Sequence, residues 1–196
     1  MGVYNILYAD PPWKYEGGKV KGAGCNHYPV MPLDEISALP VADLAADDCI
    51  LFMWTTFPKM YEAMDVMQAW GFRYRTVAFV WVKRTKTDND WFMGCGYWTR
   101  SNAEICLLAT KGKPHRFSKA VHQLIISPVE EHSKKPAETR DRIVELAGDL
   151  PRIELFARQK AKGWDVWGNE VDCDIQIQSV NKNTKNIKNK NVKEEF

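Results

Sequence analysis

The chain has 196 residues, of which 45% are hydrophobic and 27% are charged, and its formal net charge is +2. This composition is typical of one soluble globular domain, long enough for one sizeable core and too short for two. A net charge this close to zero does not by itself predict a nucleic-acid partner. The chain begins without the basic segment and apolar core of a signal peptide, and no apolar run approaches the roughly 20 residues that span a bilayer. We therefore expect a cytoplasmic protein that does not enter membranes.

The five cysteines are odd in number and form no C-x-x-C pair. This pattern indicates a reducing compartment and argues against a structural zinc site. The spacing of the four histidines gives no metal site either. We expect a protein without a metal.

Six apolar, β-rich runs recur along the chain and are predicted strands: 4–9, 49–55, 76–82, 104–110, 122–127 and 152–157. Most are nearly continuous rather than alternating, which favours strands covered on both faces of a parallel sheet. Helical patterns lie between them, over 33–39, 58–71 and 136–148. This alternation predicts an α/β fold with a mostly parallel, doubly wound sheet, which binds ligands at the carboxyl ends of its strands.

We expect a single domain over residues 1–175, followed by an Asn- and Lys-rich disordered tail over 176–196. One segment, 83–102, departs from the alternation of strands and helices. It carries four basic and four aromatic side chains together with Gly94 and Gly96. Because loops of this length in compact domains are usually functional or disordered, it is predicted to face the substrate.

The first predicted strand ends in Asp10-Pro11-Pro12-Trp13. Each proline fixes φ and removes an N–H, and the residue before a proline is held extended. The carbonyls of Asp10 and Pro11 are thus expected to face a ligand. A carboxylate beside a fixed carbonyl offers two acceptors for the N–H groups of an exocyclic amine, and Trp13 offers a face for stacking a base. The alternative is a turn that ends the strand, with an acid that caps a helix.

These motifs resemble the MT-A70 family of adenine N6-methyltransferases. The resemblance rests on "ADPPW", "NHYPVM", "SNAEICLLATKGKP", "EEHSKKPAETRDRI" and "RIELFARQKAKGWDVWGNEV", in the family's order, and covers Tyr4 to Val171. It implies a Rossmann-like class I methyltransferase fold with permuted motif order, in which the catalytic motif precedes the cofactor strand. It also implies S-adenosylmethionine as the methyl donor.

The resemblance assigns the cofactor-binding residues one by one. The lysine of the family's H-K-P motif falls on Lys135, and the glutamate that suits the ribose hydroxyls falls on Glu154. The arginine that follows corresponds to Arg158, and the family's Gly-Asn pair corresponds to Gly168 and Asn169. The family often has Gln after this Asn, where Glu170 stands here.

On the substrate side, the resemblance implies that Tyr28 contacts the target base and that Glu104 lies near the active site. Trp98 lies in the basic and aromatic loop, where Arg84 and Arg100 are the phosphate candidates.

Plainer interpretations stand beside these roles. His27 is more typical of a loop histidine than of a base, and Lys86 of a solvated charge. Arg158 can be a salt-bridge partner of Glu154, which is costly to bury unpaired. Lys135 can be a solvated lysine ahead of a helix.

The sequence thus predicts transfer of a methyl group from S-adenosylmethionine to N6 of adenine in DNA, in a bacterial or phage-infected cell. Asp10 and the Pro11 carbonyl would accept hydrogen bonds from N6 and turn its lone pair toward the methyl group. The alternatives are an RNA adenosine methyltransferase, a non-catalytic nucleic-acid-binding partner of such an enzyme, and an enzyme acting on a small-molecule amine. A homodimer or a partner subunit is possible.

Overall fold

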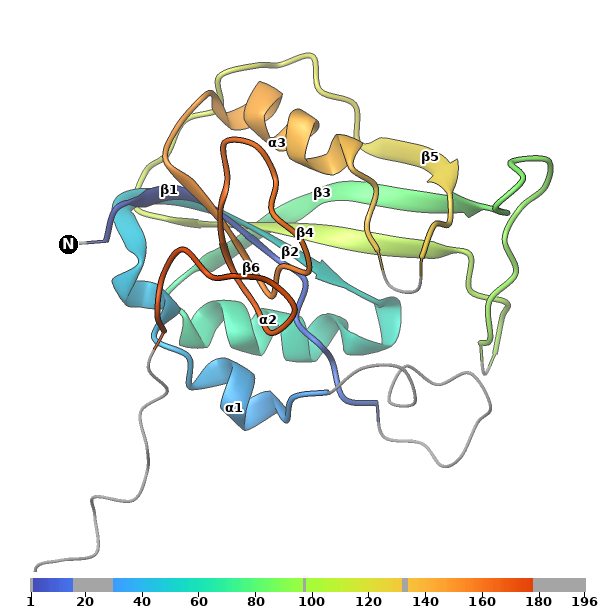
Figure 1. Ribbon diagram of the computed structural model, residues 1–196, viewed down its shortest axis with the longest axis horizontal. Helices are drawn as coiled ribbons and strands as arrows, with labels where there is room; N and C mark the ends of the chain where they lie inside the picture. Colours follow the sequence, from blue (N-terminus) through green and yellow to red (C-terminus); the bar gives the residue numbers. More distant parts are fainter. Residues whose placement is uncertain (1, 16–29, 97, 132–133, 178–196) are drawn as a thin grey trace, which may run out of the picture.

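The computed structural model of the chain describes residues 2–15, 30–96, 98–131 and 134–177. At its centre is a seven-stranded sheet in the order β5-β3-β4-β2-β1-β6-β7 (Figure 1). The strands are β1 (Tyr4–Ala9), β2 (Ala45–Thr55), β3 (Arg73–Arg84), β4 (Ala103–Lys111), β5 (Leu124–Pro128), β6 (Arg152–Leu155) and β7 (Asp165–Trp167). Only β4 runs antiparallel to its neighbours in this sheet. The predicted α/β fold with a mostly parallel sheet is confirmed.

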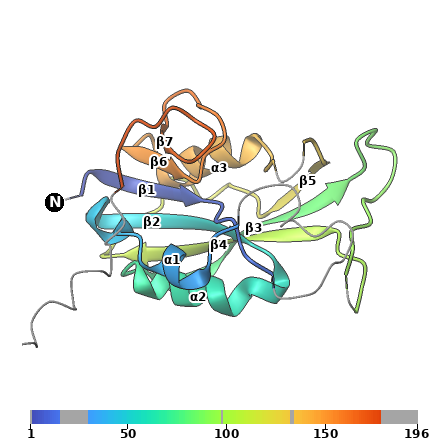
Figure 2. The same ribbon diagram turned by 60° about the horizontal axis from the view of Figure 1, so that its bottom comes forward.

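Helices cover both faces of this sheet (Figure 2). On one face lie α1 (Leu33–Ser37) and α2 (Met60–Ala69), and on the other lies α3 (Glu138–Ala147). Two short 3-10 turns, η2 (Val41–Asp43) and η3 (Phe57–Lys59), precede β2 and α2. The buried side chains accordingly form two clusters, with Met67 of α2 in one and Ile143 of α3 in the other. The sheet is therefore doubly wound, as predicted.

The predicted strands all overlap observed ones, although β2 and β3 begin at Ala45 and Arg73, before the predicted residues 49 and 76. Two further details differ. The three-residue β7 was not predicted, because so short a strand leaves no periodic signal. β6 ends at Leu155, two residues before the predicted end, because Phe156 has a φ of 62° and leaves the extended conformation. The helix predicted over 58–71 is observed as η3 and α2, and Gly71 follows its end: Gly71 has a φ of 81° and its N–H bonds to the Gln68 carbonyl, as in a Schellman cap.

The register brings the ends of several strands to one edge of the sheet. Ala9, the last residue of β1, lies between Met53 of β2 and Leu155 near the end of β6. Because β4 is antiparallel, its first residues lie beside the last residues of β3, and Glu104 pairs with Trp81. Side chains from five segments of the chain therefore meet at the carboxyl edge of the parallel strands.

Candidate active site

A cavity of about 240 Å³ opens at this edge of the sheet. Its walls come from the end of β1, the end of β2, the start of β4, the segment before α3 and the two loops that follow β6 and β7. The predicted site residues that line it are Asp10, Pro11, Pro12, Trp13, Glu104, Lys135, Arg158, Asn169 and Glu170. The structure thus places nine of the predicted residues around one cavity, although the first and the last of them are more than 150 positions apart in sequence.

The Asp10-to-Trp13 segment leaves β1 in a tight, internally bonded turn. The Trp13 N–H donates to the Pro11 carbonyl at 2.9 Å, and the Met31 N–H donates to the Pro12 carbonyl at 3.0 Å. The Pro11 carbonyl, which was expected to face a ligand, thus also accepts a hydrogen bond within its own turn. One of its two lone pairs is already used inside the turn, and only the other could serve a substrate.

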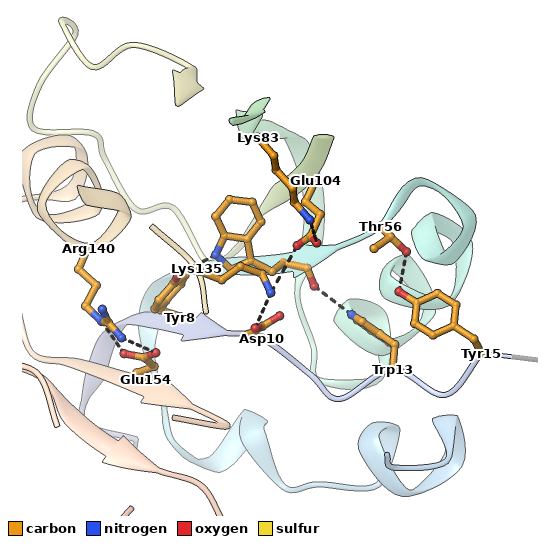
Figure 3. Close-up of polar contacts among 11 residues, drawn as sticks. Tyr8, Asp10, Trp13, Tyr15, Thr56, Lys83, Glu104, Lys135, Arg140 and Glu154 are labelled. Atoms are coloured by element: carbon orange, nitrogen blue, oxygen red, sulfur yellow. Dashed lines mark hydrogen bonds and ion pairs between the residues drawn. The ribbon is translucent and has the colours of Figure 1, made fainter. Parts of the chain in front are cut away.

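Trp13 is also more enclosed than expected of a stacking surface. Its side chain is 6% exposed, and its indole N–H donates to the Trp54 carbonyl at 3.1 Å (Figure 3). The indole therefore belongs to the core and presents only part of its surface to the cavity. Next to it, the Tyr15 hydroxyl and the Thr56 hydroxyl share a hydrogen bond of 2.8 Å at the cavity wall.

Four charged side chains form a continuous network that begins at the cavity wall, which we call the acid–lysine network (Figure 3). The Lys135 ammonium donates to Asp10 Oδ2 at 2.6 Å and lies 3.4 Å from Glu104 Oε2. The other Glu104 oxygen, Oε1, accepts from Lys83 Nζ at 2.5 Å. Two carboxylates and two ammonium groups make the network neutral, so its burial leaves no uncompensated charge.

The network sets the charge states of its members. Burial raises the pKa of Asp10, and the ammonium of Lys135 opposes this rise only in part. Burial also opposes ionisation of Glu104, but Lys135 and Lys83 together hold the pKa of that carboxyl below its usual value. Burial disfavours the charged Lys135, but Asp10 and Glu104 raise its pKa above the ordinary lysine value. Glu104 is thus the more firmly ionised of the two acids.

An aromatic floor of Trp54 and Trp81 supports the network. Lys135 Nζ lies 5.8 Å from the Trp54 ring centroid, and Lys83 Nζ lies 4.8 Å from that of Trp81. The two indoles meet edge to face at 6.4 Å. Trp54 is fixed by a 2.7 Å hydrogen bond from its N–H to the buried Tyr8 hydroxyl. Both lysines therefore rest on rings that cannot easily move.

A second cavity, of about 130 Å³, adjoins the first and contains Glu154 and Arg140. Arg140 donates to both Glu154 oxygens, at 2.6 and 2.9 Å. Arg158 is not the partner of Glu154, contrary to the salt bridge considered from the sequence: it pairs with Glu170 at 3.0 Å instead. Burial raises the pKa of Glu154, with the Arg140 guanidinium opposing that rise.

Close backbone packing positions the loop that carries Asn169 and Glu170. A Cβ on Gly168 would lie 2.1 Å from the Ala157 carbonyl oxygen, so only glycine fits there. The Ala157 N–H donates to the Trp167 carbonyl at 2.9 Å, which joins the loops that follow β6 and β7. Asn169 is brought to the wall of the larger cavity by this contact.

The segment expected to face the substrate, which we call the substrate loop, is shorter than predicted, since β3 extends through Arg84 and the loop proper is 85–102. Arg84 donates hydrogen bonds to Asp88 within this loop, and its guanidinium carbon lies 4.6 Å from the centroid of the Trp91 ring. Trp98 is 91% exposed, and Arg100 is also exposed. Neither lines the cavity. Tyr28 and His27 lie outside the described residues.

The sequence did not single out Arg140, Tyr15 or Lys83 as functional residues. Lys83 was visible only as one member of a basic run, and Arg140 as one of several charges on α3. The signal available for both was the presence of a carboxylate, Glu104 or Glu154, inside an apolar strand, because each such group requires a cationic partner.

Two absences hold for the described part of the chain. No three histidine, cysteine, aspartate or glutamate side chains there are grouped as a metal ion would require. Within the same ranges, no helix combines the length and apolar character needed to cross a bilayer.

Comparison with known proteins agrees with the motifs. The MT-A70 family model matches residues 4–170. Type II methyltransferase M.MunI from Mycoplasma sp is 38% identical over 196 residues, which cover 89% of this chain and 81% of that protein. The N(6)-adenosine-methyltransferase MT-A70-like protein of Arabidopsis thaliana is 28% identical over 175 residues, which cover 88% of this chain but 24% of that protein. The chain therefore belongs to the MT-A70 family of S-adenosylmethionine-dependent adenine N6-methyltransferases.

Proposed function

We propose that the protein transfers a methyl group from S-adenosylmethionine to the N6 amino group of adenine in DNA. The observation that carries the proposal is the Asp10 carboxylate, held by Lys135 at the cavity in the position where the family's D-P-P-W motif falls. Its other oxygen, Oδ1, has no partner among the described residues, so it can accept a hydrogen bond from an amino group.

The chain's own residues can orient such an amino group. The N6 of adenine is a poor nucleophile because its lone pair is delocalised into the ring. N6 would donate hydrogen bonds to Asp10 and to the remaining lone pair of the Pro11 carbonyl. These bonds would turn the lone pair of N6 out of conjugation with the ring. The ionised Asp10 would also stabilise the positive charge that develops on N6. Its raised pKa makes it a suitable acceptor for the proton that N6 releases afterwards.

The residues around both cavities fit S-adenosylmethionine, which when bound would supply an activated methyl group on a sulfonium. Lys135 offers a cation, Phe156 an aromatic surface, and Asn169 an amide at the larger cavity. Glu154 keeps acceptor capacity beyond its two bonds to Arg140, because a carboxylate has about four lone-pair sites. We assign Lys135, Glu154, Arg158, Asn169 and Glu170 to the cofactor.

The choice of DNA rests on the extent of the matches. The chain spans four fifths of a bacterial protein named a type II methyltransferase, but only a quarter of the plant protein named an adenosine methyltransferase. We place the protein in the bacterial or phage-infected cytoplasm, where DNA is accessible. The loop 85–102 and Tyr28 would meet the nucleic acid, with Arg100 on phosphate and Trp98 on a base.

The test uses purified protein, labelled S-adenosylmethionine, and duplex DNA or RNA of the same adenine-containing sequence. We expect label in DNA, recovered as N6-methyladenine by mass spectrometry, and none with the Asp10→Ala variant. Label in RNA alone would contradict the DNA assignment. Label unaffected by Asp10→Ala would contradict the mechanism, and no label in either nucleic acid would contradict the proposed function.

A further inference from the structure

We propose that Lys83 is a positioning residue that couples the substrate loop to the acceptor carboxylate, by fixing Glu104 so that Lys135 stays on Asp10. This proposal rests on the proposed function, because it assigns the loop to the substrate and Asp10 to the reacting amino group. It concerns a residue that does not line either of the two cavities described above.

The first step in the argument is the asymmetry of Lys135 between its two carboxylates. Its ammonium lies 2.6 Å from Asp10 but 3.4 Å from Glu104, although Glu104 is the more firmly ionised acid. Lys83 accounts for this difference, because it engages the other Glu104 oxygen at 2.5 Å and satisfies part of its charge. Without Lys83, Glu104 would compete for Lys135 and draw it away from Asp10.

The second step is the burial of this contact. The side chains of Lys83 and Glu104 are 16% and 17% exposed, so water screens their attraction poorly. Lys83 Nζ also lies over the Trp81 ring, and its position is therefore constrained from below. An ion pair exposed to solvent would have little electrostatic effect on Asp10. The Lys83–Glu104 pair, in contrast, lies within the same low-dielectric network as Asp10.

The third step is the connection to the substrate loop. The Lys83 carbonyl accepts from the Phe92 N–H at 3.0 Å, and the Lys83 N–H donates to the Asn102 carbonyl at 2.8 Å. The Phe92 ring also lies 5.8 Å from Lys83 Nζ. Lys83 is thus bonded to the middle and to the last residue of a loop that carries Trp91, which is 48% exposed. A nucleic acid that moves this loop would move Lys83, and with it Glu104.

The charged groups that face Glu104 are Lys83 from β3, Lys135 from the segment before α3, and Asp10 from the end of β1. Removal of Lys83 leaves two carboxylates with one ammonium. The pKa of Glu104 must then rise, since one of the two cations that lower it is gone. The pKa of Asp10 must rise as well, because Lys83 also lowers it and Lys135 becomes more evenly shared.

The test compares Lys83→Met with Lys119→Met, the same change at an exposed lysine that lies outside the loop and lines neither cavity. For Lys83→Met we expect a loss of about 10- to 100-fold in the single-turnover rate of methyl transfer to DNA. The acid limb of its rate profile should move to higher pH, while affinity for S-adenosylmethionine measured by calorimetry changes little. The melting temperature at neutral pH should fall, because the largely buried Glu104 loses one of its two cations. Lys119→Met should match the wild type.

Two further variants keep the proposal falsifiable. In a Glu104→Gln background, Lys83→Met should cause no further shift of the acid limb, because the shift acts through Glu104. Phe92→Leu should cause a smaller loss of rate, because it weakens the contact between the loop and Lys83. Lys83→Met with the pH profile of the wild type would overturn the proposal, and so would a shift of the same size in the Glu104→Gln background.

A readout without turnover separates this proposal from the proposed function. Carbon-13 NMR of labelled glutamate can follow the titration of Glu104 in the wild type and in Lys83→Met. If the wild type methylated no nucleic acid but the Glu104 pKa rose in Lys83→Met, the proposed function would fail and the coupling would stand. An unchanged Glu104 titration would overturn the coupling, whatever the activity.

Discussion

Asp10 and Glu154 are carboxylates at the ends of neighbouring parallel strands, and each takes its main cation from the region of α3. Glu154, with a side chain 10% exposed, is held by two bonds from Arg140. Asp10, at 27% exposed, has a single bond from Lys135, which it shares with Glu104. An arginine fork fixes a carboxylate in one orientation, whereas an ammonium is a point charge that permits adjustment. The difference separates a carboxylate that the scaffold holds in one orientation, as suits our proposed cofactor contact, from one that can adjust to a substrate.

The largest effect is expected from breaking the scaffold pair. Arg140→Met leaves Glu154 buried without its cation, and should lower the free energy of unfolding by about 3–5 kcal/mol. Urea denaturation at neutral pH measures this loss. The double variant Arg140→Met, Glu154→Gln removes the unpaired charge and should recover much of the stability. An Arg140→Met protein as stable as the wild type would contradict the view that this pair is structural.

The next effect concerns catalysis rather than stability. Asp10→Asn keeps the shape of the side chain but removes its charge, so it should slow methyl transfer by about 10²- to 10³-fold. Thermal unfolding should change little, because Asp10 is the more exposed of the two acids. Single-turnover kinetics provide the measurement, with the exposed Asp34→Asn as the matched control. A large loss of stability with normal kinetics would assign Asp10 to the scaffold instead.

Lys135→Met should have a smaller effect on stability, and the direction in which this effect changes with pH can be predicted. The pKa of Asp10 is already raised in the folded protein, so ionising Asp10 costs folding free energy as the pH rises through that pKa. Removing Lys135 removes a cation that lowers this pKa, which must then rise further. Stability should therefore fall by about 1–3 kcal/mol at neutral pH and less in acid, where Asp10 is protonated in both states.

Urea midpoints measured from acid to neutral pH test this sign, and the acid limb of the methyl-transfer profile should move to higher pH with them. Lys134→Met is the matched control, because the neighbouring lysine pairs with Glu130 at the surface. Stability lost equally at every pH would exclude Asp10 as the group that responds.

The strands and the family could be predicted from sequence because both depend on local patterns. The motif at Asp10 and the apolar runs are each contiguous in the chain. The partners within the site could not be predicted in this way. Arg140 lies 14 residues before Glu154, and Lys83 lies 21 before Glu104, so each contact depends on how α3 and β3 pack. The bond inside the Pro11 turn was missed because rigidity alone does not reveal which N–H a fixed carbonyl accepts.

The smallest effect is expected at a third carboxylate of the same cavity. Glu170 pairs with Arg158, but these side chains are 48% and 44% exposed. A pair this exposed contributes about 0–1 kcal/mol, and salt screens it. Glu170→Gln, which restores the residue common in the family, should therefore change the free energy of unfolding by less than about 1 kcal/mol in low salt and by nothing measurable in high salt. Urea denaturation at two salt concentrations measures this difference. A loss of stability as large as that expected for Arg140→Met would contradict this difference between the buried and the exposed pair. Neither the exposure of a carboxylate nor the number of its hydrogen bonds would then explain how much its ion pair stabilises the protein.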